Sequence, residues 1–294
     1  MEELEKARKK ALKKKIIGYS ITFSAMLLCL LSGFLFLIMI VLIFGILLTH
    51  FISAKNVKSF KDLYKQNIVI RTFNSIFTDV QFDLDKGISY NTIANTKMMH
   101  MGDRFYSNDY VKAKYKNINF EMSDVHIEEE YTDSDGNTSY VTIFKGQWYI
   151  FDFNKSFKAN LQVCEKSFMN AKRGGLFSKE KFQKVELEDI EFNKIFKVYA
   201  VNELDAFYVL TPHTMEKIKE VNKKIKGHIL LCFIDNKLHI GLHNNRDLFE
   251  ASIYKKINLD EAIEKTKQEM SIITNFVDIL NLDNDLFKFE GGVL

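Results

Sequence analysis

The chain has 294 residues, of which 47% are hydrophobic and 27% are charged; this composition excludes an intrinsically disordered protein. Its formal net charge of +3 is unevenly distributed, because residues before position 55 carry seven Lys/Arg and three Glu (+4) and the remainder carries −1. The near-neutral remainder lacks the broad basic surface of a nucleic-acid-binding protein, so we expect no nucleic-acid partner.

Residues 16–54 contain no Asp, Glu, Lys or Arg. A single transmembrane helix needs about 20 apolar residues, and the apolar region of a secretory signal has only about 7–15. The segment therefore predicts a membrane anchor. Its length fits one long tilted helix, or two helices that form a hairpin turning near residues 32–33.

The charges on both sides of this segment favour the hairpin. The N-terminal side holds seven basic residues, and the C-terminal side holds five basic residues between positions 55 and 71 against the single acid Asp62. Cytoplasmic flanks carry an excess of Lys and Arg, and only an even number of spans places both flanks on that side. We therefore predict a basic cytoplasmic tail over residues 1–15, a multi-pass anchor of two spans over residues 16–54, and a cytoplasmic soluble part.

Residues 55–104 are predicted to form a connector helix and a linker. Apolar residues recur at helical spacing over residues 56–78, mixed with scattered basic residues. Two interpretations stay open: a connector helix packed on the domain, which we prefer, and an amphipathic helix lying on anionic lipid.

Residues 105–294 predict a soluble α+β domain with a mixed, mainly antiparallel sheet and flanking helices. Alternating apolar and polar residues predict strands over 107–153, and Asp135-Gly136 between two alternating runs predicts a hairpin turn. A separate strand is expected over 147–153. The Gly-rich stretch at 170–175 suggests an internal boundary near 170–180.

The pattern after residue 185 predicts one strand, a hairpin of two strands and three helices. A helix is expected over 186–196 and a strand over 196–201. Thr211 and Pro212 predict a helix start, and Gly227 its end. Strands over 228–233 and 237–242 are expected to form a hairpin. Asn258 and Glu261 resemble a capping box before a helix whose apolar stripe is expected to pack on a sheet.

No metal or cofactor is predicted. His239 and His243 are the first, weak metal candidates, because four-residue spacing places two imidazoles on one face. Zinc, however, needs a third and usually a fourth ligand. We interpret them as surface histidines on an edge strand. The 98–101 sequence MMHM could suit copper, although Met commonly fills cores. The acidic stretch before Gly136 is not a calcium loop, because Tyr131 and Thr142 occupy the first and twelfth ligand positions, where carboxylates are needed. We interpret it as a solvated hairpin tip.

The three cysteines show no disulfide or zinc framework. Cys29 lies in the apolar segment, and Cys232 lies in a run typical of a buried strand. A reducing compartment is compatible with this pattern, and a Cys164–Cys232 bridge stays open as the alternative.

No catalytic motif is present, so no catalytic residue is assigned and enzymatic activity is not expected. We predict a non-catalytic module that binds a membrane or cytosolic protein, or the bilayer. The first surface to test is the aromatic strand with Trp148, Tyr149, Phe151 and Phe153. The alternative is an enzyme or small-ligand receptor whose site is assembled from distant residues. Its possible contributors are His126, Asp152, Glu186, His213 and His239.

A set of motifs resembles the bacterial membrane-protein family known as domain of unknown function 3137 (DUF3137). The motifs are DYVKAK at 109–114, IFKGQWYIFDFNKSF at 143–157, VELEDIEF at 185–192, FKVY at 196–199, AFYVLTP at 206–212 and FIDN at 233–236. The resemblance covers roughly residues 105–257 and the anchor arrangement. It implies a bacterial membrane protein with an α+β soluble part, and it implies no activity, cofactor or catalytic residue.

Overall fold

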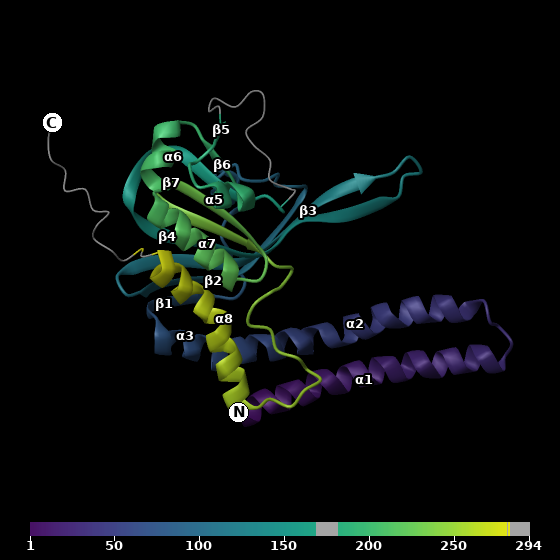
Figure 1. Ribbon diagram of the computed structural model, residues 1–294. Coiled ribbons are helices and arrows are strands. Elements are labelled where there is room, and N and C mark those ends of the chain that lie inside the picture. Colours follow the sequence, from purple (N-terminus) through teal and green to yellow (C-terminus); the bar gives the residue numbers. More distant parts are fainter. Residues whose placement is uncertain (169–181, 281, 283–294) are drawn as a thin grey trace. The chain divides into compact units, whose positions relative to one another are not determined.

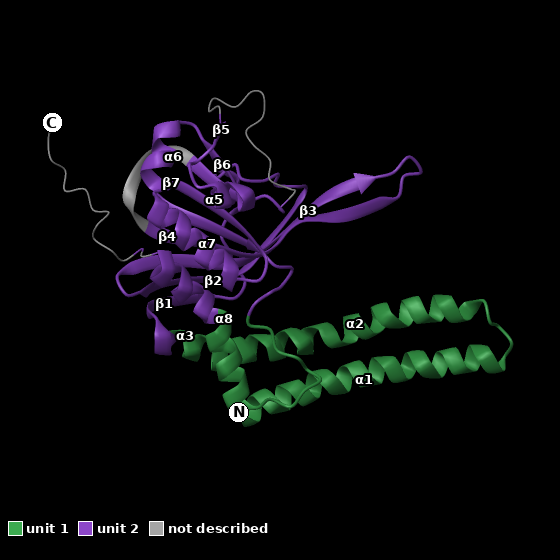
Figure 2. Ribbon diagram, in the orientation of Figure 1, with its two compact units in different colours: residues 1–73, 249–269 green, residues 74–248, 270–294 purple. Residues whose placement is uncertain are grey.

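The computed structural model describes residues 1–168, 182–280 and 282. It divides into two compact units, shown in Figures 1 and 2: unit 1 comprises residues 1–73 and 249–269, and unit 2 comprises residues 74–248 and 270–294. The boundary predicted near 170–180 lies largely outside the described residues. The predicted domain limits stay predictions.

Unit 1 is built on two long helices that pack side by side (Figure 1). They are α1 (Glu2–Leu31) and α2 (Leu37–Tyr64), joined by a short turn in which Gly33 has a φ of 73°. The chain continues without a break from α2 into the π-helical segment η1 (Lys65–Val69) and α3 (Ile70–Ile76). The helix predicted over 56–78 is thus the continuation of the second apolar helix.

Unit 2 holds an open antiparallel sheet, which confirms the predicted α+β class. Its first elements are β1 (Thr78–Asp83), α4 (Tyr90–Ala94), β2 (Arg104–Tyr115), β3 (Ile118–Thr132) and β4 (Thr138–Glu165). The predicted Asp135-Gly136 turn joins β3 and β4, and Gly136 has a φ of 81°. The strand expected separately over 147–153 is instead part of the 28-residue β4.

The central strand β4 has a different neighbour along each half of one edge. Its first half pairs with β3 and its last residues pair with β6 (Phe196–Ala200), which also pairs with β5 (Gln183–Val185). On its other edge, β4 pairs with β7 (His228–His243) over most of its length. The hairpin expected around Asp235-Asn236 is wrong, because β7 is one continuous strand whose register shifts opposite β4 accommodate this stretch.

The helices of the C-terminal part begin with local capping chemistry. They are α5 (Ile190–Ile195), α6 (Glu203–Val209), α7 (Pro212–Lys224) and α8 (Leu259–Leu280). The Thr211 side chain accepts from the Thr214 N–H at the start of α7, and Asn258 bonds Glu261 at the start of α8, as predicted. The helix expected over 186–196 is shorter, because Asp189 caps α5 through the Phe192 N–H.

Apolar side chains cover both faces of the sheet in unit 2. On one face, Trp148 belongs to a buried cluster with Cys164 and Cys232. On the other face, the rings of Tyr149 and Phe151 lie 5.2 and 5.8 Å from that of Phe276 on α8. Because strand residues alternate between faces, the 148–151 run contributes to both layers.

Candidate functional site

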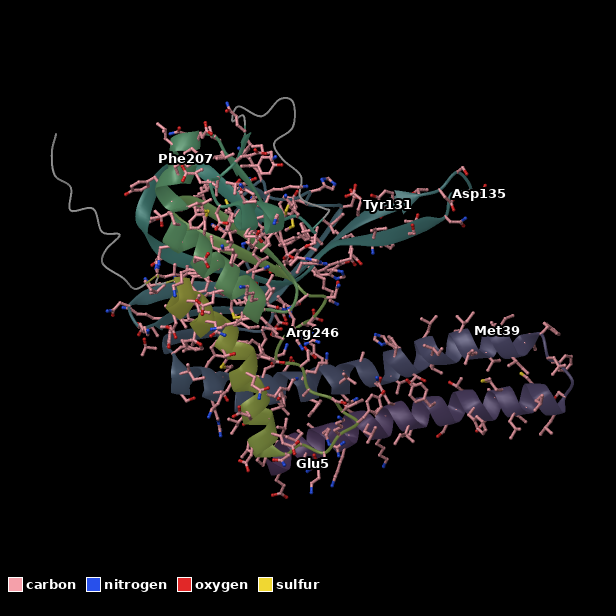
Figure 3. All side chains as sticks on the ribbon, viewed as in Figure 1. Glu5, Met39, Tyr131, Asp135, Phe207 and Arg246 are labelled. Carbon is pink, nitrogen blue, oxygen red and sulfur yellow. The ribbon has the colours of Figure 1, made fainter. Side chains whose placement is uncertain are left out.

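The two helices of unit 1 carry their large apolar side chains on the outside. Leu31, Phe36 and Phe51 are 76%, 72% and 83% exposed, and Met39 lies on the outer side of α2 (Figure 3). Both helices are long and apolar enough to cross a membrane by length and composition. Monomeric soluble proteins rarely leave so large a continuous apolar surface uncovered.

Small and hydroxyl-bearing residues fill the contact between the two helices. Gly18 of α1 faces Thr49 of α2, and Gly45 of α2 faces Thr22 of α1; a Cβ on Gly45 would lie 2.2 Å from Thr22 Cγ2. The two threonine hydroxyls are satisfied within their own helices, at 3.0 and 2.8 Å from the carbonyls of Gly18 and Gly45. Close approach at small residues is how helices associate in lipid, where burial of apolar surface gives no driving force.

A segment from far along the chain fastens the base of this hairpin. We call residues 249–258 the strap. Arg8 on α1 donates to the Ile253 carbonyl at 2.7 Å, and Glu250 forms ion pairs with Lys61 and Lys65 on α2. Burial alone raises the pKa of Glu250, but these two lysines lower it below its usual value. The strap therefore holds both helices through charged contacts.

The two predicted metal candidates lie in β7 but have separate surroundings. His239 is only 6% exposed, so the expectation of a surface residue is wrong for it; its Nδ1 lies 3.3 Å from Trp148 Nε1, which donates. Burial lowers the pKa of His239 to about 4, with a smaller contribution from Lys237. His243 accepts the Lys145 N–H at Nδ1. Within residues 1–168, 182–280 and 282, no group of three His, Cys, Asp or Glu is placed to hold a metal.

A buried polar network that was not predicted from the sequence surrounds Asp124 in unit 2. Asp124 accepts from Gln147 Nε2 at 2.9 Å and from the Leu248 N–H at 3.0 Å. Gln147 in turn donates to the Arg246 carbonyl and accepts from Asn244. Burial raises the pKa of Asp124 well above its usual value. The network fixes residues 244–248 against β3 and β4, which is a structural role.

The residues of the alternative hypothesis contact different neighbours. His126 contacts Thr142 and Glu128, and Asp152 contacts Asn119 and Lys237. Glu186 pairs with Lys184; His213 lies at the start of α7. None of these contacts joins two of the five proposed contributors.

Several other predicted groups are part of the core. Trp148, Tyr149 and Phe151 are fully buried, so they do not form the partner surface suggested for them. The three methionines of MMHM are also buried, in the Trp148 cluster. Cys164 and Cys232 do not form the disulfide that stayed open as an alternative. At the hairpin tip, Asp133 accepts the N–H groups of Asp135 and Asn137.

Comparison with protein families confirms the resemblance seen in the sequence. Residues 142–282 match the family described as "Protein of unknown function (DUF3137)". The match includes most of β4 and all of β7, α7 and α8. This description assigns no activity to the matched segment.

Among solved structures, the chain is similar to the crystal structure of the mycobacterial trehalose monomycolate transport factor A, TtfA. The similarity has a TM-score of 0.36 at 8% identity and covers 73% of this chain and 94% of that chain. At this score it carries no conclusion about fold or function. No curated protein matches the chain.

Proposed function

We propose that this chain, whose residues 142–282 match the DUF3137 family, is anchored in a bacterial membrane by the α1–α2 hairpin and presents its sheet domain in the cytoplasm. There it acts as a non-catalytic module that binds a partner protein. The observation that supports the anchor is the distribution of side chains on the hairpin. Large apolar side chains lie on its outside, and Gly, Thr and Ser lie between the two helices.

The dimensions of the hairpin fit this role. The apolar parts of the two helices, residues 16–31 and 37–54, have lengths of about 24 and 27 Å at 1.5 Å per residue. The hydrocarbon core of a bilayer is about 30 Å thick. Lys15 and Lys55 flank these parts and can extend their ammonium groups toward the headgroups, and local thinning accommodates the remaining mismatch.

The sidedness follows from the basic residues at the base. Both ends of the hairpin carry Lys and Arg, and such flanks stay on the cytoplasmic side. The ion pairs from Glu250 to Lys61 and Lys65 neutralise part of that charge locally, while the lysines of the 9–15 segment keep the excess on α1.

The surface we assign to a partner protein is the arm, defined as residues 128–142 at the end of the β3–β4 hairpin. The arm projects from the sheet (Figure 1), and Tyr131 and Asp135 lie on it (Figure 3). It has five acidic residues and no basic one, and Tyr131, Tyr140 and Val141 are 54%, 40% and 49% exposed. Arg104 of β2 lies over the Tyr140 ring, 3.6 Å from its centroid. The exposed Tyr131 beside the acidic residues of the arm is therefore the part that fits a basic partner surface.

The anchor and its sidedness are tested together by membrane extraction and by paired reporters fused after Leu294. The proposal expects the chain to stay in the membrane fraction at alkaline pH. It also expects the reporter that is active only in the cytoplasm to give the signal. Release from the membrane would contradict the anchor, and activity of the external reporter would contradict the two-span topology.

The partner surface is tested by a photo-crosslinking residue placed at Tyr131 in cells, with Phe207 as the matched exposed position on α6. A discrete adduct from Tyr131, lost when the acidic residues of the arm are neutralised, supports the assignment. Equal crosslinking from Tyr131 and Phe207, or none from Tyr131, would contradict it.

A further inference from the structure

We propose that the strap is a second membrane-contacting element, in which Tyr254 lies at the bilayer interface and Lys255 and Lys256 bind anionic phospholipid headgroups. This inference rests on the proposed membrane insertion of the α1–α2 hairpin. It assigns a lipid class and a binding segment that lies about 200 residues after the anchor in the sequence.

The level of the strap along the hairpin is set by Lys15. Lys15 is the last charged residue of α1 before the apolar segment, so it marks the polar boundary of the bilayer. Its Nζ lies 3.2 Å from the Tyr254 hydroxyl and 5.4 Å from the centroid of the Tyr254 ring. Tyr254 is therefore at the depth where Tyr is enriched in membrane proteins, with its ring toward the acyl chains and its hydroxyl among headgroups.

Two contacts keep Tyr254 at this level. The neighbouring Ile253 is 4% exposed, and its carbonyl accepts from Arg8. Glu5 fixes the Arg8 guanidinium with two hydrogen bonds of 2.8 and 2.7 Å. Because Ile253 is held against α1, the next side chain points outward, and Tyr254 is 61% exposed.

The two lysines after Tyr254 supply the charge. Lys255 and Lys256 are exposed, and no described ion pair engages either of them. Lys13 and Lys14 on α1, next to Lys15, are exposed as well. Each lysine ammonium near an anionic leaflet raises the binding constant for that leaflet about fivefold. This pair is therefore expected to enrich anionic lipid beside Tyr254.

The test measures quenching of tryptophan fluorescence by brominated lipids in proteoliposomes of the full chain. The wild type, whose single Trp148 is buried, gives the background. A Tyr254→Trp variant is compared with a Met39→Trp variant, which reports on the hairpin. We expect bromines near the headgroup to quench the Tyr254→Trp signal, and bromines deep in the acyl chains to quench the Met39→Trp signal.

Lipid class is tested by placing the bromines on phosphatidylglycerol or on phosphatidylcholine at equal mole fraction. We expect phosphatidylglycerol to quench the Tyr254→Trp signal about two- to five-fold more strongly. Adding Lys255→Gln and Lys256→Gln should bring the ratio close to one. Adding Lys223→Gln and Lys226→Gln on and beside α7, which remove the same charge, should leave it unchanged.

The outcomes separate this inference from the proposed anchor. Deep quenching of the Met39→Trp signal with no quenching of the Tyr254→Trp signal would overturn the strap's membrane contact and leave the anchor standing. No deep quenching of the Met39→Trp signal would overturn the anchor itself. Equal quenching by the two lipid classes would overturn the assignment to anionic headgroups.

Discussion

Protonation of His239 is expected to destabilise the folded protein below neutral pH. Its imidazole is 6% exposed and accepts the Trp148 Nε1–H, and burial lowers its pKa from 6.5 to about 4. Between these two values the unfolded state binds the proton and the folded state does not. Stability is therefore fully present above pH 6.5 and is lost as pH falls toward 4. Lowering pH from 7 to 5 should cost about 2 kcal/mol from this residue.

The assay is urea unfolding of the full chain in nonionic detergent micelles, followed through the fluorescence of Trp148, the only tryptophan. The His239→Gln variant, which cannot titrate, is the comparison. The free energy of unfolding of the wild type should fall between pH 7 and 5 by about 2 kcal/mol more than that of the variant. Equal losses in the two proteins would refute the assignment of a depressed pKa to buried His239.

Three further changes have defined outcomes. Gly45→Ala should separate the hairpin helices and cost about 1–3 kcal/mol, seen as a lower thermal midpoint, whereas the outward-facing Ile46→Ala should not; equal midpoints would contradict the packing. Thr211→Ala should cost about 1 kcal/mol in the urea assay through loss of the α7 cap; no change would contradict that cap. Asp124→Asn removes an acid with a raised pKa, so wild-type stability relative to the variant should decline as pH rises above 3.8; a constant difference would contradict the raised pKa.

The features predicted correctly from the sequence depend on neighbouring residues. The apolar segment forms two helices that are separated at Gly33, whose φ of 73° suits glycine. Asp135-Gly136 forms a turn because the φ of 81° at Gly136 suits glycine. The starts of α7 and α8 follow from capping side chains within three positions of each other. Such local chemistry can be read directly from one sequence.

The features that were missed depend on residues far apart in the sequence. Asp235-Asn236 has the composition of a turn, but pairing of β7 with the long β4 overrides that local preference. Likewise, the hydrogen bond from Arg8 to the Ile253 carbonyl joins residues 245 positions apart, and no pattern among neighbouring residues predicts it.

Two missed features did leave a signal in the sequence. Gly18 and Thr22, and Gly45 and Thr49, repeat the small-residue spacing by which helices associate in lipid. Asp124 follows Phe120 and Met122 at period two, so it is a carboxylate in the buried phase of a strand. A polar residue in such a position indicates a network that must satisfy it.

The proposed function requires that the α1–α2 hairpin cross the bilayer with its base on the cytoplasmic side. The direct measurement is labelling of single introduced cysteines with a membrane-impermeant maleimide, in a Cys29→Ser background where Cys164 and Cys232 are buried. We predict that Ser32→Cys, at the turn, reacts in intact cells and that Ser59→Cys, at the base, reacts only after permeabilisation. Equal reactivity of the two positions from one side of the membrane would contradict the account.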